Sequence, residues 1–180
     1  MIHPSAFIHE RALADDSVSI GARSRVWQFA SVIRGTVLGE DCTVASSATL
    51  DGPVFGDRCI ISQGVAMGPG FLIGDDVFIG PNVTVCNDRW PRTYKTGFDL
   101  KKFQSGYITV RIHNWVSIGA NAVILPGVVL GKRVMVAAGA VVDRNVPADC
   151  LYTRQGKMLP VSEKHEARYA RARMREAIKC

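Results

Sequence analysis

Residues 112–142 read IHNWVSIGANAVILPGVVLGKRVMVAAGAVV, and every sixth residue of this stretch, from Ile112 to Val142, is branched and apolar. The same six-residue period extends over most of the chain. A helix has a period of 3.6 residues and a single amphipathic strand a period of two, so neither explains the pattern. The positions that follow it are Ile2, Ile8, Ala14, Ile20, Val26, Val32, Leu38, Val44, Leu50, Phe55, Ile61, Met67, Ile73, Ile79, Val85, Ile112, Ile118, Ile124, Leu130, Val136 and Val142.

A six-residue period is typical of a solenoid built from short parallel strands. Three such hexads would close one triangular coil, with the leading apolar residue inside and a small residue four positions later at the corner. We therefore predict an all-β solenoid, a parallel β-helix whose backbone groups pair between coils. The alternative is a β-sandwich of short strands, but sandwiches do not keep a fixed six-residue phase for so long.

Two segments depart from the repeat. Residues 86–111 form an insertion between two hexads, and a long loop that leaves a rigid scaffold is a common place for function. Pro147 ends the repeat, and Ser162 can cap a helix whose apolar residues follow at helical spacing. We predict a β-helix over 1–147 with the insertion at 86–111, and a cap segment with a C-terminal α-helix over 148–180.

Composition limits the possible classes of protein. The chain has 180 residues, of which 47% are hydrophobic, enough for one domain with a sizeable core. No apolar run is long enough to span a bilayer and no secretory signal is visible, so we expect a cytoplasmic protein without stable membrane insertion. The five cysteines show no CxxC pattern, which fits a reducing compartment and gives no sign of a metal site; Cys42 and Cys59 fall on inward positions.

The formal net charge of +6 is unevenly distributed. Residues 151–180 contain eight Lys and Arg against three Glu, so the repeat region is close to neutral. Because the basic residues have no interleaved aromatic residue beyond Tyr169, we do not expect nucleic-acid binding. Two explanations stay open: a solvated helix face, or attraction for a phosphate-rich small molecule or for anionic surfaces.

Several segments resemble known enzymes. The segment IGANAVILPGV at 118–128, with 136–142 and 145–148, resembles the last coils of hexapeptide-repeat acyltransferases. The segment VFIGPNV at 77–83, which leads into NDRWPR at 87–92, is similar to nucleotide-sugar N-acetyltransferases that act on 3-amino-3-deoxy sugars of bacterial surface polysaccharides, as is VWQF at 26–29.

The resemblance implies a left-handed coil, a homotrimer with sites shared between subunits, acetyl-CoA as co-substrate and no metal. It also implies N-acetylation of a UDP- or dTDP-linked 3-amino-3-deoxy sugar in the synthesis of O-antigen, as part of lipopolysaccharide, or of a related glycan. The alternatives are a sugar O-acetyltransferase, or an N-acyltransferase for another acyl-CoA or a 4-amino sugar. We expect the flat, weakly charged face at 123–129 to be buried between subunits.

Three residues are candidates for catalysis. In the resembling subgroup an Asn is thought to align the amine while the departing thiolate takes the proton, and Asn87 matches that Asn. Its side-chain oxygen can accept a hydrogen bond from the amine. Asp88 is a second candidate, because a carboxylate could hold the proton or orient a water. His113 is the weakest of the three candidates, although it is the only histidine that is plausible as a base. An Asx turn opening the loop would explain Asn87 and Asp88 equally well.

The same resemblance, together with the chemistry of coenzyme A, indicates binding residues. Small residues let a pantetheine arm approach the backbone, and basic residues meet phosphates. The predicted cofactor-binding residues are Gly119, Ala120, Ala137, Ala138, Arg144 and Lys157. The predicted substrate-binding residues are Arg34, Arg89, Arg92 and Tyr94. Each has a structural alternative, because small residues also suit corner packing and basic residues also suit a solvated surface.

Two other classes fit the sequence less well. A γ-type carbonic anhydrase shares the fold, but it needs zinc-binding histidines at close spacing, and the four histidines of this chain are scattered. A purely structural subunit would need no insertion. We therefore expect a coenzyme A-dependent enzyme.

Overall fold

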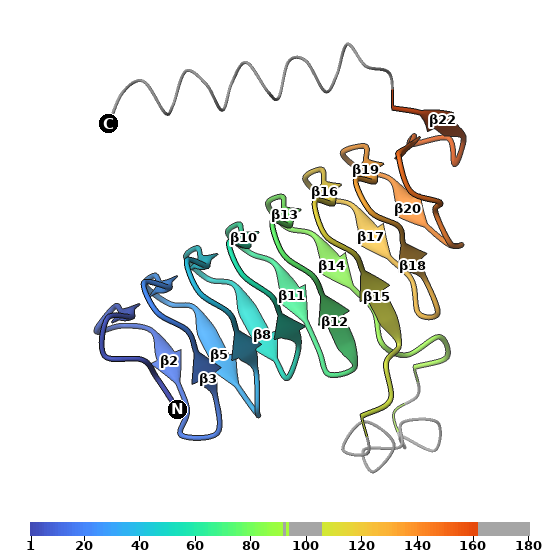
Figure 1. Ribbon diagram of the computed structural model, residues 1–180. Helices are drawn as coiled ribbons and strands as arrows, with labels where there is room; N and C mark the ends of the chain where they lie inside the picture. Colours follow the sequence, from blue (N-terminus) through green and yellow to red (C-terminus); the bar gives the residue numbers. More distant parts are fainter. Residues whose placement is uncertain (92, 94–105, 162–180) are drawn as a thin grey trace, which may run out of the picture.

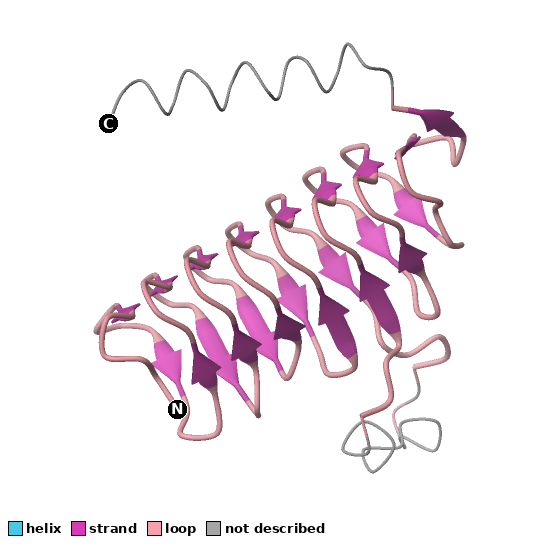
Figure 2. Ribbon diagram, in the orientation of Figure 1, coloured by secondary structure: helices cyan, strands magenta, loops and turns pink. Residues whose placement is uncertain are grey.

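The computed structural model describes residues 1–91, 93 and 106–161, which form a parallel β-helix (Figures 1 and 2). This confirms the all-β solenoid expected from the six-residue period. Strands that are consecutive in sequence belong to three different sheets in rotation, so three strands make one coil. The left hand of the coil stays a prediction, and the predicted C-terminal α-helix lies outside the described residues.

Three sheets form the sides of the prism. In the largest sheet, the last two strands at the C-terminal edge form an antiparallel hairpin. The nine-stranded sheet contains β1 (Phe7–Ile8), β4 (Arg25–Val26), β7 (Thr43–Val44), β10 (Ile60–Ile61), β13 (Phe78–Ile79), β16 (Ser117–Ile118), β19 (Met135–Val136), β21 (Cys150–Tyr152) and β22 (Met158–Pro160). The seven-stranded sheet contains β2 (Leu13–Ala14), β5 (Ser31–Ile33), β8 (Thr49–Asp51), β11 (Ala66–Met67), β14 (Thr84–Val85), β17 (Val123–Ile124) and β20 (Val141–Val142). The six-stranded sheet contains β3 (Ser19–Ile20), β6 (Val37–Leu38), β9 (Val54–Phe55), β12 (Phe71–Ile73), β15 (Val110–Ile112) and β18 (Val129–Leu130).

The interior of the prism is filled by the leading residues of the hexads. From Ile20 to Val142 each of these side chains is at most 4% exposed, and Cys42 and Cys59 are buried core thiols as predicted. The prediction for Ile2 is wrong, since its side chain is 40% exposed. Ile2 belongs to the first turn of the chain, where no earlier coil covers it.

The corner between the six- and nine-stranded sheets carries one residue per coil with a positive φ, between 55° and 61°. In chain order these residues are Arg23, Asp41, Arg58, Asp76, Trp115, Arg133 and Asp149. We call this row the charged ladder, because basic and acidic side chains alternate along it apart from Trp115. Its contacts include Arg23 to Asp41 at 2.7 Å, Arg58 to Asp76 at 2.9 Å, and Trp115 Nε1 donating to Asp76 at 2.9 Å. The ladder thus links successive coils by opposite charges.

The C-terminal end is closed by the antiparallel hairpin of β21 and β22. Strand β21 pairs in parallel with β19, so the nine-stranded sheet continues past the predicted boundary at residue 147 (Figure 1). Tyr152 on β21 is buried, and its hydroxyl donates to Asp143 at 3.0 Å. The segment expected to be a cap strand therefore joins the solenoid directly.

The insertion lies between β14, which ends at Val85, and β15, which begins at Val110 (Figure 1). It leaves the prism at the corner between the seven- and six-stranded sheets, which we call the loop corner. Its start agrees with the prediction, and its end comes two residues earlier. Among the described residues, no helix is long and apolar enough to cross a membrane.

Candidate functional site

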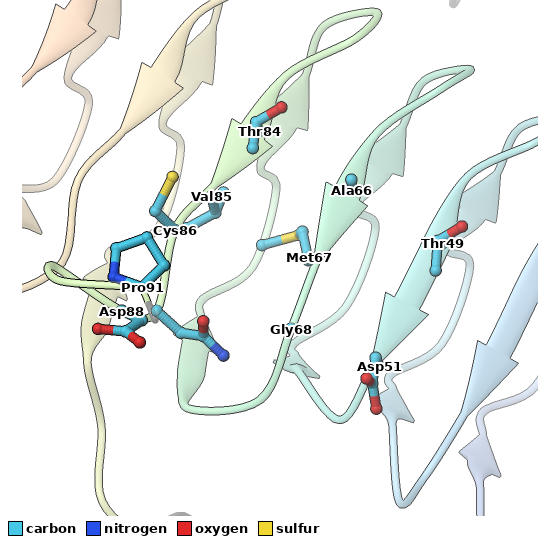
Figure 3. A pocket seen from close by; sticks show the side chains of 11 residues that line it. Thr49, Asp51, Ala66, Met67, Gly68, Thr84, Val85, Cys86, Asp88 and Pro91 are labelled. Carbon is cyan, nitrogen blue, oxygen red and sulfur yellow. The ribbon is translucent and has the colours of Figure 1, made fainter. Parts of the chain in front are cut away.

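A pocket of about 390 Å³ lies on the outer face of the seven-stranded sheet, at the base of the insertion (Figure 3). It extends across three neighbouring strands, β8, β11 and β14. Its lining residues are Thr49, Asp51, Ala66, Met67, Gly68, Thr84, Val85, Cys86, Asn87, Asp88 and Pro91.

The floor of the pocket consists of small outward-facing side chains. Ala66 pairs in register with Thr49 on one side and Thr84 on the other, and all three are exposed (Figure 3). Because side chains alternate along a strand, their neighbours Leu50, Met67 and Val85 point into the core. The hexad pattern therefore fixes a flat, uncrowded floor beside the insertion.

Asn87, the main catalytic candidate, is half-buried and lies against the coil before its own. Its Nδ2 donates to the Pro69 carbonyl at 3.4 Å, and a Cβ on Gly68 would come within 2.7 Å of the same Nδ2. Because Gly68 has no side chain, there is space for the Asn87 side-chain amide. Among the described residues, the Asn87 Oδ1 atom has no hydrogen-bond partner.

Asp88 has one oxygen engaged in the loop. Its Oδ1 accepts a hydrogen bond from the Trp90 backbone N–H at 2.8 Å, which is the Asx turn considered as the structural alternative. Within the described part of the chain, Oδ2 has no such partner, and Asp88 is one of the residues that line the pocket. The turn and a role in binding are therefore compatible, because each uses a different oxygen.

Asp51 is a pocket residue that sequence reasoning missed. It ends β8 at the loop corner, and its Oδ1 lies 2.8 Å from Nε of Arg34, a predicted substrate-binding residue. The side chain of Asp51 is 22% exposed and that of Arg34 is 69% exposed. The signal that could have found Asp51 is its position, since it precedes the corner glycine Gly52 one coil before Gly68.

The remaining acceptor-side candidates are dispersed. His113 follows β15 and is exposed at the corner of the charged ladder, so the six-stranded sheet separates it from Asn87 within this chain. Arg89 is exposed and is not part of the pocket lining. Arg92 and Tyr94 lie outside the described residues. The structure brings together Asn87, Asp88 and Arg34 through Asp51, and does not bring His113 to them.

The predicted cofactor residues with small side chains are stacked at the corner between the nine- and seven-stranded sheets. A Cβ on Gly119 would come within 2.5 Å of the Ala138 backbone nitrogen, so coil packing by itself requires this glycine. Gly139 N donates to the Ala120 carbonyl at 2.8 Å. This corner and the loop corner are the two edges of the same sheet, and the pocket lies near the loop corner.

The two predicted phosphate-binding residues meet at the C-terminal end. Arg144 lies 3.1 Å from Asp143, and a Cβ on Gly156, next to Lys157, would come within 3.2 Å of Arg144 Nη2. The hydroxyl of Tyr152, followed by the charge of Asp143, raises the pKa of the Arg144 guanidinium. Lys157 is exposed in the turn between β21 and β22. Both cations are exposed, and Arg144 lies near the residue that precedes Lys157.

Cys86 is the thiol of the pocket. Burial raises its pKa, so it remains a neutral thiol at neutral pH and is a poor nucleophile. In the described part of the chain, no group of three or more His, Cys, Asp or Glu side chains could hold a metal ion. The chemistry open to the pocket is therefore hydrogen bonding and charge from Asn87, Asp88 and Asp51.

Comparisons with known proteins agree on the repeat. Residues 109–144 match the family described as bacterial transferase hexapeptide (six repeats). The chain is 36% identical over 77 residues to galactoside O-acetyltransferase of Lactococcus lactis, a stretch that covers 42% of this chain and 35% of that protein. It is 26% identical over 159 residues to the bifunctional protein GlmU of the same strain, covering 88% of this chain and 31% of GlmU. The chain thus spans about a third of these curated relatives.

Solved structures share the fold. A hexapeptide-repeat acetyltransferase of Vibrio cholerae, complexed with acetyl coenzyme A, is 28% identical, with a TM-score of 0.54 over 69% of this chain and 70% of that one. AntD, an N-acyltransferase of Bacillus cereus in complex with dTDP and 3-hydroxybutyryl-CoA, has a TM-score of 0.58 over 97% of this chain and 89% of its own, at 16% identity. The chain therefore shares the β-helix fold of these structures, and its residues 109–144 match the hexapeptide repeat of bacterial transferases.

Proposed function

We propose that this protein transfers an acetyl group from acetyl-CoA to the amine of a nucleotide-linked 3-amino-3-deoxy sugar, in the synthesis of O-antigen or a related glycan. The observation that carries the proposal is the pocket at the base of the insertion, where Asn87 and Asp88 each have one side-chain oxygen without a hydrogen-bond partner among residues 1–91, 93 and 106–161. The nucleotide would be UDP or dTDP. Relatives and solved structures named as acetyltransferases or acyltransferases support the class of reaction.

The proposed step needs a neutral amine aimed at the thioester carbonyl. The nitrogen forms a bond to the carbonyl carbon, the carbon–sulfur bond breaks, and the departing thiolate takes the amine proton, which gives an amide and free coenzyme A. The Asn87 oxygen would accept a hydrogen bond from the amine and so orient its lone pair. Asp88 would hold the amine from the other side of the loop.

Acetyl-CoA would lie along the late coils, from the stacked Gly119 and Ala137 segments to the cluster of Arg144 and Lys157. The first group offers close access to backbone hydrogen-bonding groups, and the second offers positive charge to phosphates. The solved Vibrio cholerae acetyltransferase, which was complexed with acetyl coenzyme A, supports this choice of co-substrate.

We also propose a homotrimer in which the exposed outer faces of the prism meet. Val141, on the outer face of β20, is an exposed apolar residue of the kind that such an interface would cover. Light scattering on the purified protein at micromolar concentration should return the mass of three chains, and the mass of one chain would contradict this assembly.

Acetylation of a sugar hydroxyl is the second candidate, and the similarity to galactoside O-acetyltransferase favours it. The absence of a histidine from the described pocket lining favours the amine instead, since a hydroxyl needs a base to lose its proton in the attack. Release of free thiol from acetyl-CoA, measured with nucleotide-linked amino sugars and with the matching hydroxyl sugars, separates the two. Thiol release with the hydroxyl sugars alone would contradict the N-acetyltransferase proposal.

A further inference from the structure

The pocket beside Asn87 is bounded by a carboxylate at each end, and the described residues that line it include no basic side chain. Asp51 ends β8 and Asp88 follows β14, with β11 between these two strands (Figure 3). Neighbouring strands lie about 4.8 Å apart, so the two ends are separated by roughly 10 Å. A pyranose ring bound between them would approach both carboxylates.

Arg34 pairs with Asp51 and offsets part of its charge, and the charge of Asp88 keeps the sign of the described pocket residues negative. The distance from Arg34 Nε to Asp51 Oδ1 is 2.8 Å, and Arg34 is 69% exposed whereas Asp51 is 22% exposed. The carboxylate therefore faces the pocket from a partly buried position, while the guanidinium lies in solvent, where water and salt screen its charge. Among the described residues that line the pocket, the charged side chains are the two carboxylates of Asp51 and Asp88.

We infer that Asp51 is a specificity-determining residue that selects acceptor sugars whose ring carries an amine but no carboxylate. The inference rests on the proposed function, which leaves the identity of the acceptor open. Hydroxyl groups and an amine can donate hydrogen bonds to Asp51 and Asp88. A ring carboxylate would instead face like charges in partly desolvated surroundings, which discriminates against it by repulsion. The acceptors are thus amino hexoses or amino deoxyhexoses, and amino hexuronates are rejected.

The test uses two acceptors that differ only at C6: nucleotide-linked 3-amino-3-deoxyglucose and nucleotide-linked 3-amino-3-deoxyglucuronate, each prepared with UDP and with dTDP. We expect kcat/KM to be at least about tenfold higher for the hexose in the wild-type protein. Because the discrimination is electrostatic, the ratio should shrink between about 0.05 M and about 0.5 M NaCl.

Asp51→Asn removes the repelling charge and frees Arg34, so we expect the ratio to fall by about tenfold. Asp16→Asn is the matched control, since Asp16 is an exposed aspartate that follows β2 at the same corner of the prism. That control should keep the wild-type ratio. If Asp51→Asn does not fold, the salt dependence of the wild-type ratio decides the question.

Equal use of both acceptors by the wild-type protein would overturn the inference, as would an Asp51→Asn variant with wild-type selectivity. If the proposed function itself is wrong, neither acceptor will cause release of free thiol, which distinguishes that outcome from loss of selectivity. Calorimetric titration of the two nucleotide sugars without acetyl-CoA still compares their affinities in that case, and equal affinity would overturn the charge selectivity on its own.

Discussion

Asn87 lies directly over Gly68, so that a Cβ added to the glycine would come within 2.7 Å of the Asn87 Nδ2 atom. Gly68 belongs to the preceding coil, where it follows β11. The position of the catalytic candidate therefore depends on a residue that is distant in sequence and has no functional group of its own.

Gly68→Ala should displace the Asn87 side chain and lower kcat/KM for the acceptor by about tenfold, because misalignment of an aiming group costs rate. The KM for acetyl-CoA should stay unchanged. Steady-state kinetics on Gly68→Ala, Asn87→Ala and the double variant form a thermodynamic cycle. If Gly68 acts through Asn87, the double variant is no worse than Asn87→Ala, and fully additive losses would contradict this coupling.

Asn87→Ala should lower kcat/KM by about a hundredfold, which corresponds to roughly 3 kcal/mol of transition-state stabilisation. His113→Ala should have little effect, since the six-stranded sheet separates His113 from the pocket. The two variants and their pH–rate profiles are the measurement. Loss of activity in His113→Ala, with removal of a titration near its ordinary pKa of about 6.5, would establish an imidazole base instead.

Lys157→Ala should raise the KM for acetyl-CoA and leave the KM for the sugar nearly unchanged, because Lys157 and Arg144 form the proposed phosphate cluster. The same variant should distinguish less well between acetyl-CoA and its 3′-dephospho form. A rise confined to the sugar KM would place this cluster on the acceptor side. Arg11→Ala, an exposed arginine in the first coil, is the matched control.

The charged ladder should make stability depend on acid pH. Hydrogen bonds from Arg23 and Arg133 hold the pKa values of Asp41 and Asp149 below their usual value. The unfolded chain then takes up protons at a higher pH than the folded protein. The stabilisation is therefore complete above the ordinary Asp pKa of about 3.9 and is lost as the pH falls through the lowered values.

Thermal unfolding followed by circular dichroism at several pH values between about 7 and 3 tests this dependence. Arg23→Gln should lower Tm at neutral pH and should lose less Tm on acidification than the wild-type protein, because Asp41 then loses the hydrogen bond that lowers its pKa most. Arg11→Gln should behave as the wild type. An Arg23→Gln profile parallel to that of the wild type would show that the ladder does not contribute to stability.

The six-residue period predicted the solenoid because the period arises from burial in the core. From Ile20 to Val142, each leading residue of a hexad is buried inside the prism. The prediction failed at Ile2, where the end of the prism removes the covering coil. The period also located the insertion, because a break in a regular pattern is visible in one sequence. The catalytic candidates Asn87 and Asp88 could be named for the same reason.

The sequence did not reveal the partners of these residues. Gly68 contacts the position of Asn87, and Asp51 lines the same pocket, only because coils stack. The six-residue period does not show which corner each hexad occupies after a five-residue step and a long insertion. His113 seemed adjacent to the site because it follows the insertion closely. It lies at another corner, since a strand of the six-stranded sheet intervenes.

The alternation of charge along the ladder also limits how the length of this protein can change in evolution. Loss or duplication of a single coil between Arg23 and Asp76 would bring two like charges together at the new junction. Loss or gain of two coils would preserve the alternation. Homologues of different length should therefore differ by pairs of coils in this part of the prism, or should carry a compensating charge reversal at the junction.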